Sequence, residues 1–389
     1  MARSAGLFVT VLLIVVVAFS ASDVAATDVE DIFERAQAGF EYAGSAQILQ
    51  ERRHIEEIAT NALPRFPTPS MGGGITWQMH PRTGMTWELD GRPGMPIITG
   101  ESFGPLYAER AQTVGQGRVF VSFSYARVEY DDLDGHGLDR VNKVPPVRWD
   151  WGEDTWLEVD ALYGLDIVSD ILTVQATVGV TDRWDIGVLV PYIEHDFRVK
   201  GVENIRWRDR YAVTPPDVPN HEISNHNVVH DEARGMGDLI VRSKYFAAKS
   251  RFVDVSIGLD VRAPTGAQDD LLGTGDVGVK PYLILSKTLD RLTPHLNVGH
   301  EWNTSHSKLN AIYYAAGMDV KVHNRLTLAG DIIGTSRDNG GASDVVDGNI
   351  GLKINLFDDV LLTASALVPI GNDGLRADVI GTVGLEWAF

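Results

Sequence analysis

From Arg118 onwards, the sequence consists of stretches in which every second residue is apolar. The segment 252–264, FVDVSIGLDVRAP, shows this pattern clearly. One face would carry Val253, Val255, Ile257, Leu259 and Val261, and the other Asp254, Ser256, Gly258, Asp260 and Arg262. A period of two residues is the spacing of a β-strand, whose successive side chains point to opposite faces. We therefore expect long strands, each with one apolar and one polar face.

Twelve such stretches follow one another, separated by turn residues. They span approximately 118–130, 168–180, 183–197, 236–247, 252–264, 275–287, 291–302, 309–322, 325–334, 346–357, 359–369 and 376–389. Tight connections alternate with longer ones, and the segments 131–167 and 198–235 are predicted to be long loops.

Two architectures use strands of this kind: a soluble β-sandwich, which buries the apolar faces in a core, and a transmembrane barrel, which turns them to lipid. Many of the stretches reach 12 residues, whereas soluble strands are usually about 5–6 residues long and a tilted membrane strand needs about 9–11. The even strand number and the alternation of short and long connections also favour the barrel. We predict an all-β fold: a transmembrane, antiparallel, up-and-down β-barrel of about 12 strands, with a partly helical N-terminal extension.

The final stretch, GTVGLEWAF, is predicted to be the last membrane strand. Phe389 and Trp387 would face lipid at an aromatic girdle, and Glu386 would face the lumen. The terminal aromatic pattern resembles the assembly signal of outer-membrane barrels, so we assign that role to Phe389 and Trp387.

The N-terminus has the layout of a secretory signal peptide. Arg3 precedes an apolar run from Leu7 to Phe19, and small residues follow as far as Ala26. We predict a signal peptide at 1–26 and an extension at 27–117. This extension would be helical over 28–60 and then rich in Pro and Gly, and it would form either a periplasmic segment or a lumen plug. The barrel is predicted to be 118–389.

Charged residues on the polar faces are predicted to point into the lumen, because a charge at the bilayer midplane costs about 2–4 kcal/mol. The predicted lumen-lining residues are Arg242, Lys244, Asp254, Asp260, Arg262, Asp276, Lys280, Glu301, Asp319, Lys321, Asp331, Lys353 and Glu386, together with His295. They could line a solute path, or they could fill a closed barrel as a salt-bridge network. Proline inside a strand removes a ladder hydrogen bond, so Pro191 marks a possible kink in the wall or a bulge at its rim.

Composition and motifs exclude several functions. The formal charge of −19 disfavours nucleic acid, and the lack of Cys excludes disulfides and thiolate chemistry. The loop 130–140 begins like a calcium loop but has Lys143 where the bidentate Glu should be. The histidine cluster 221–230 has irregular spacing, and we predict no metal site. We find no nucleophile, phosphate-binding or dinucleotide-binding motif. We therefore predict no catalytic residues, no cofactor and no enzymatic activity.

Several stretches resemble the bacterial outer-membrane proteins labelled as meta-pathway phenol-degradation proteins or transporters. They are FGPLYAERAQTVGQGRVFVSFSY (103–125), VGVTDRWDIGVLVPYIEHDF (178–197), GMGDLIVRSKY (235–245), GLDVRAPTGAQDDLLGTGDVGVKPYL (258–283) and the closing strand. The resemblance covers about 103–389. It implies a barrel related in architecture to fatty-acid and aromatic-hydrocarbon channels, and it implies the fold more firmly than the solute.

We predict a monomeric channel in the outer membrane of a Gram-negative cell, exported by its signal peptide, for facilitated diffusion of small hydrophobic or aromatic solutes. The alternative is a closed structural or surface barrel whose acidic loops bind a ligand or a partner. The predicted partners are outer-membrane lipid and lipopolysaccharide, the barrel assembly machinery and a small-molecule solute, with no nucleic acid.

Overall fold

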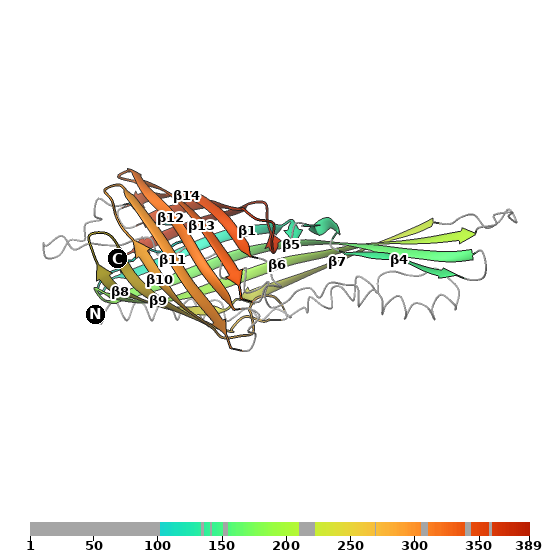
Figure 1. The fold of residues 1–389 in the computed structure, drawn as a ribbon, viewed down its shortest axis with the longest axis horizontal. Helices are drawn as coiled ribbons and strands as arrows, with labels where there is room; N and C mark the ends of the chain where they lie inside the picture. The colour runs from blue at the N-terminus through green and yellow to red at the C-terminus, as the bar shows by residue number, and fades with distance from the viewer. Residues whose placement is uncertain are drawn as a thin grey trace.

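In a computed structural model, the chain forms a closed β-barrel (Figure 1). The structure describes residues 102–389, except 134–135, 141, 151–154, 210–221, 269, 305–309, 339–343 and 358–359. The predicted signal peptide and helix, at 1–26 and 28–60, lie outside the described residues. Within the described part, no helix is long and apolar enough to cross a membrane.

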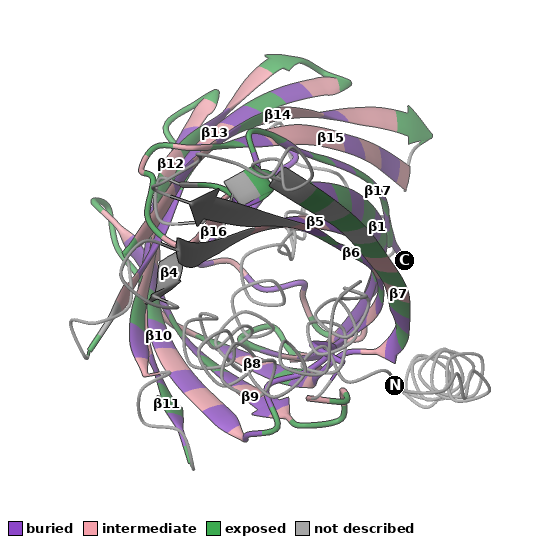
Figure 2. Ribbon diagram, turned by 90° about the vertical axis from the view of Figure 1, so that its right-hand side faces the viewer, coloured by how far each residue is buried: buried purple, intermediate pink, exposed green. Residues whose placement is uncertain are grey.

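The barrel wall contains twelve antiparallel strands in the described residues when β7 and β8 are counted as one (Figure 2). They are β1 (Val119–Tyr130), β5 (Thr155–Thr181), β6 (Trp184–Asp209), β7 (Glu222–Met236) with β8 (Leu239–Lys249), β9 (Asp254–Ala263), β10 (Gly278–Ser286), β11 (Leu292–Asn303), β12 (Ala311–His323), β13 (Leu326–Arg337), β14 (Val345–Phe357), β15 (Val360–Pro369) and β17 (Ile380–Ala388). Each strand pairs with the next, and β17 pairs with β1 to close the ring. The predicted twelve-stranded up-and-down barrel is confirmed.

Short pieces lie outside this ring. They are β2 (Asp132–Leu133), β3 (His136–Gly137), a 3₁₀ turn at Leu138–Arg140, β4 (Asn142–Asp150) and β16 (Leu375–Arg376). Tight turns such as 182–183 and 324–325 join strands at one end of the barrel, called the turn end. The longer connections, such as 264–277, lie at the other end, called the loop end.

The prediction of long loops at 131–167 and 198–235 was wrong. Strands β5 and β6 continue to the loop end and pair as far as Thr155 with Asp209, β7 pairs with β6, and β4 pairs with β5. The paired strands project beyond the rest of the wall as an arm (Figure 1). The apolar alternation fails here because the outward face becomes charged, as in the ion pair of Lys200 with Asp166 at 2.5 Å.

Strand β6 changes its partner at Pro191. Residues 184–189 of β6 pair with β8, and residues from Tyr192 onwards pair with β7. Gly237, in the break between β7 and β8, donates its N–H to the carbonyl of Pro191 at 2.9 Å. Proline has no N–H for the ladder, so the break in the neighbouring strand lies where a ladder bond would be lost. Pro191 stays in register opposite Thr173, and the wall kink remains a prediction.

The two faces of the wall differ as a membrane barrel requires. Large apolar side chains are exposed on the outside, including Phe123, Ile257 and Trp387, which are 46%, 54% and 52% exposed. Residues next to them in the sequence, such as Ser122, Ser256 and Glu386, are buried inside. An apolar outer band with a polar interior is the pattern of barrels that cross lipid.

Candidate solute pathway

Residues 102–117, called the strap, run along the inner wall near the turn end. Backbone N–H groups of the strap donate to five inward side chains on four strands. Phe103 donates to Thr327 at 2.8 Å, Tyr107 to Asp331 at 3.1 Å, Glu109 to Asn297 at 2.6 Å, Ala111 to Ser286 at 2.9 Å and Val114 to Asp185 at 2.9 Å. The polar inner wall thus satisfies the backbone of a segment that has no strand pairing of its own.

An ion pair fixes the middle of the strap. The guanidinium of Arg110 contacts Asp319 on β12, with Nε to Oδ1 at 3.3 Å, and both side chains are fully buried. His295 on β11 lies beside this pair, with Nε2 at 2.6 Å from Asp331 and Nδ1 at 3.7 Å from Asp319. On the other side, Lys244 donates to the carbonyl of Gln112 at 2.8 Å. Charged side chains therefore hold the strap against the wall at both its middle and its end.

The structure buries twelve of the thirteen Asp, Glu, Lys and Arg residues that are predicted to line the lumen, and it buries His295 as well; Lys321, near the turn end of β12, is half-buried. Several are brought together across neighbouring strands. Arg242 pairs with Asp260 at 3.1 Å, Lys280 with Asp260 at 3.5 Å, Arg262 with Glu301 at 2.7 Å and Lys353 with Glu386 at 2.7 Å.

The remaining predicted residues contact other parts of the interior. Lys244 lies 3.9 Å from Asp185, Asp254 accepts a hydrogen bond from Gln112 at 3.1 Å, and Asp276 accepts one from Thr304. Their role in a solute path stays a prediction.

A small aromatic cavity lies on the side of the strap that faces the loop end. It has a volume of about 50 Å³ and is lined by Tyr107 of the strap, Tyr282 on β10 and Tyr313 on β12, with Asn297 and Thr335. The ammonium of Lys280 lies 4.9 Å from the centroid of the Tyr313 ring and 5.8 Å from that of Tyr282. Both distances are within the range of a cation–π interaction. The cavity therefore offers flat apolar surfaces beside a fixed positive charge.

Glycines make room for Tyr282. Gly258 on β9 and Gly299 on β11 are its direct neighbours in the ladder. A Cβ atom on Gly258 would lie 2.1 Å from Cζ of the Tyr282 ring. The ring can lie flat over β9 only because position 258 has no side chain.

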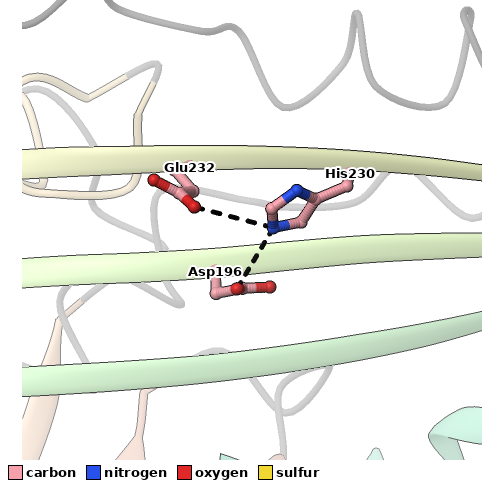
Figure 3. Close-up of side chains that lie close together, drawn as sticks. All are labelled: Asp196, His230 and Glu232. Atoms are coloured by element: carbon pink, nitrogen blue, oxygen red, sulfur yellow. Dashed lines mark hydrogen bonds and ion pairs between the residues drawn. The ribbon is translucent and has the colours of Figure 1, made fainter.

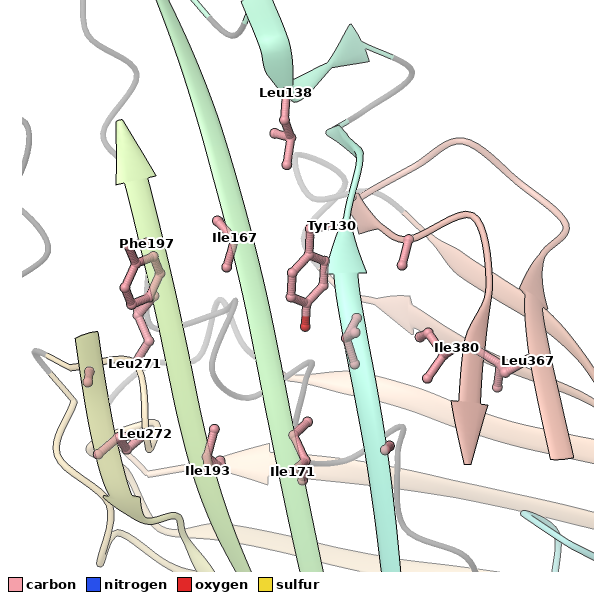
Figure 4. Packing of buried hydrophobic residues seen from close by; sticks show 14 of the residues in the cluster. Tyr130, Leu138, Ile167, Ile171, Ile193, Phe197, Leu271, Leu272, Leu367 and Ile380 are labelled. Atoms are coloured by element: carbon pink, nitrogen blue, oxygen red, sulfur yellow. The ribbon is translucent and has the colours of Figure 1, made fainter. Parts of the chain in front are cut away.

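A buried apolar cluster lies in the half of the lumen towards the loop end (Figure 4). Val128 and Tyr130 on β1, Ile167 and Ile171 on β5, and Phe197 on β6 are all buried there. Leu271 and Leu272, from the connection between β9 and β10, pack against this cluster, as do Leu106 and Tyr107 of the strap. This buried cluster therefore extends from the loop end to Tyr107, which also lines the aromatic cavity.

One carboxylate anchors the connection 264–277, which supplies Leu271 and Leu272. Asp238, fully buried in the break between β7 and β8, accepts hydrogen bonds from the N–H of Thr274 at 2.8 Å, its hydroxyl at 2.7 Å and the N–H of Gly266 at 3.1 Å. Arg262 lies 3.4 Å from the same carboxylate. The anchor holds the two leucines over the lumen.

Sequence reasoning offered a lumen plug as one of two alternatives for 27–117, but it gave none of the contacts of the strap, and it missed the three tyrosines and the Asp238 anchor. The period-two pattern assigned Tyr282 and Lys280 to the same face, but nothing in it indicated the ring contacts. The only sequence signal for Asp238 is its position directly after Gly237 and before the apolar alternation that begins at Leu239.

At the C-terminus, the rings of Trp387 and Phe389 meet edge to face with centroids 5.1 Å apart, and both are exposed on the outer face. Phe389 also exchanges two backbone hydrogen bonds with Val119, each 2.9 Å long. The last residue is thus part of the seam that closes the barrel. Its role as an assembly signal stays a prediction.

Fold and lumen together define a β-barrel of the membrane-spanning type with a strapped, partly apolar interior. The chain belongs to the family described as "Putative MetA-pathway of phenol degradation", whose model matches residues 151–354. No curated protein matches this chain.

Solved structures with a similar fold include membrane channels. An outer membrane channel from Pseudomonas putida F1 is 14% identical, with a TM-score of 0.44, covering 72% of this chain and 98% of its own. The KdgM porin is 10% identical, with a TM-score of 0.36, covering 69% and 99%. The CymD monoaromatic hydrocarbon channel is 6% identical, with a TM-score of 0.34, covering 71% and 89%.

Proposed function

We propose that this protein is an outer-membrane channel that lets small hydrophobic or aromatic solutes diffuse into the periplasm. The observation that carries the proposal is the buried apolar cluster that extends from Leu271 and Leu272, past Ile167 and Phe197, to Tyr107 at the tyrosine-lined cavity. A sugar pore has no use for such a lining, because hydroxyl groups would lose hydrogen bonds to water there. The family description, which refers to phenol degradation, supports the same solute class.

The outer surface supports the proposed location in the outer membrane. Exposed apolar side chains surround the wall, and charged pairs such as Arg127–Asp170 begin where the arm leaves it. In the proposed orientation, the turn end faces the periplasm and the arm faces the exterior, because outer-membrane barrels have short periplasmic turns and longer extracellular loops. The partners in this proposal are outer-membrane lipid, lipopolysaccharide, the assembly machinery that inserts barrels and the solute, and the channel acts as a monomer.

The path in the proposal has two parts. Apolar solutes enter at the loop end, where the hydrophobic effect favours transfer from water. They then meet the cavity beside Lys280, where an aromatic ring can stack on Tyr282 or Tyr313. The strap narrows the lumen between this cavity and the turn end. A solute therefore passes only if the strap shifts or if the solute is small enough to pass beside it.

Paired variants on opposite faces of β5 test the proposal. Ile167 points into the apolar lumen, and its neighbour Val168 points outwards. In liposomes carrying refolded protein, Ile167→Asn is expected to lower the entry rate of an aromatic acid several-fold, because it places an amide in the path. Val168→Asn, the matched control, leaves the rate unchanged. Equal rates for the wild type and both variants would contradict the proposed path and favour a closed structural barrel.

A further inference from the structure

Three side chains of metal-ligand type converge on the outward face of the arm (Figure 3). His230 and Glu232 lie two residues apart on β7, so they share a face. Asp196 on β6 is directly opposite Glu232 in the ladder. His230 is the member of the histidine cluster 221–230 that the fold places beside two carboxylates.

The distances suit a small ion. Nε2 of His230 lies 3.1 Å from Oδ2 of Asp196 and 3.8 Å from Oε1 of Glu232. One ligand atom from each residue lies within 4.8 Å of the other two. Ligands at about 2.0–2.1 Å from a tetrahedral zinc ion are roughly 3.3 Å apart, so small rotations of the side chains would bring all three into the coordination sphere.

The backbone beneath these ligands is already fixed. The ladder between β6 and β7 runs from Tyr192 with Met236 to Arg206 with Glu222, and the three ligand positions lie within it. A site on paired strands holds its ligands more firmly than a site on a loop. The side chains are partly exposed, with His230 at 46%, so an ion can reach them from outside the barrel.

We propose that Asp196, His230 and Glu232 bind a divalent transition-metal ion of the zinc class, with water in the fourth position. An imidazole nitrogen selects zinc and its neighbours over calcium and magnesium, which prefer oxygen ligands. The ion bridges β6 and β7 just beyond the point where β6 changes its partner from β8 to β7. It therefore clips β7, which pairs with no other strand among the described residues, to β6.

Arg198 provides a second, independent test of the proposed metal site. It lies directly opposite His230, and its guanidinium is 3.3 Å from Oδ2 of Asp196, the same oxygen that faces His230. A metal ion and this guanidinium compete for one carboxylate. Replacing Arg198 by a neutral residue is therefore expected to strengthen metal binding, although no ligand has been added.

The test is calorimetric titration of the full-length, tag-free protein in detergent micelles with zinc chloride, and separately with calcium chloride. The wild type is expected to bind one zinc ion per chain in the micromolar range and calcium at least 10-fold more weakly. His230→Gln weakens zinc binding at least 10-fold, and Arg198→Gln tightens it several-fold. His226→Gln, an exposed histidine on the same strand, serves as the matched control and leaves binding unchanged.

Three results would overturn the proposal. They are no saturable zinc binding by the wild type, equal losses in His230→Gln and His226→Gln, and calcium binding as tight as zinc. A folding defect in a variant is detected separately, because a folded barrel migrates differently from the heated protein on a gel. The arm variants lie outside the apolar belt, so the barrel is expected to fold in each of them.

Discussion

The ammonium of Lys353 lies 2.7 Å from a carboxylate oxygen of Glu386, and the two side chains meet inside the barrel across the intervening strand β15. Their exposed fractions are 0% and 4%. This contact explains how the closing strand can contain a carboxylate between Leu385 and Trp387, which both face outwards. Because side chains alternate along β17, Glu386 points inwards. Lys353 on β14, two strands away in the sheet, neutralises its charge.

Breaking this pair is expected to destabilise the barrel strongly. Lys353→Met leaves a buried carboxylate without its cation, and such changes cost about 3–5 kcal/mol. The double variant Lys353→Met with Glu386→Leu removes both charges and is expected to recover most of the loss. Urea unfolding in lipid vesicles measures the free energies. A single variant within 1 kcal/mol of the wild type, on the scale of an exposed pair, would contradict the buried ion pair.

Loosening the strap is expected to open the lumen. Arg110→Ala removes the ion pair with Asp319, and the strap then depends on hydrogen bonds from its backbone. Single-channel conductance in a planar bilayer is expected to rise several-fold and to fluctuate more. Arg325→Ala, in an exposed turn at the same end, is the control and keeps the wild-type conductance. Unchanged conductance in Arg110→Ala would show that the strap does not limit passage.

The tyrosine cavity depends on a missing side chain. Gly258→Ala would place a Cβ atom against the ring of Tyr282, so the ring must move into the lumen and the aromatic-acid entry rate is expected to fall. Gly381→Ala is the control, because a Cβ atom there meets nothing within 4 Å. If the two glycine variants pass the solute equally well, Tyr282 does not line the route.

The Asp238 anchor should control the order of the connection 264–277. Asp238→Ala removes the acceptor for the amides of Gly266 and Thr274. Hydrogen exchange followed by mass spectrometry is expected to show faster exchange at these amides. Asp373→Ala, an exposed carboxylate in another connection, is expected to leave exchange across 264–277 unchanged. Slow exchange in Asp238→Ala would mean that other contacts, such as the packing of Leu271 and Leu272, are enough to hold the connection in place.

The barrel could be predicted because lipid imposes a simple rule on each strand. A face that meets lipid must be apolar, as with Ile257 and Leu259, and the alternation is then visible in one sequence. The arm could not be predicted in this way. Its outward face meets water, so positions such as Asp166, Asp196 and Lys200 break the apolar pattern while the backbone ladder continues.

For the interior, the alternation predicts which side chains point into the lumen, but it does not predict which of them contact one another. Alternation placed Arg242, Asp260 and Lys280 on inward faces, but their pairing depends on strand order and register. The strap has no periodic pattern, because its partners are single side chains such as Asn297 and Ser286 from separate strands. Contacts of this kind arise only when the closed barrel brings distant segments together.

The most direct test of the channel compares the entry of 4-hydroxybenzoate and xylose into liposomes that carry the wild-type protein. The carboxylate of 4-hydroxybenzoate slows its passage through lipid, so protein-mediated entry is measurable. The apolar lumen and the tyrosine cavity predict faster entry of the aromatic acid than of the sugar, and faster entry than into empty liposomes. Entry of both solutes at the rate of empty liposomes, with the barrel folded, or faster entry of xylose would contradict a channel for aromatic solutes.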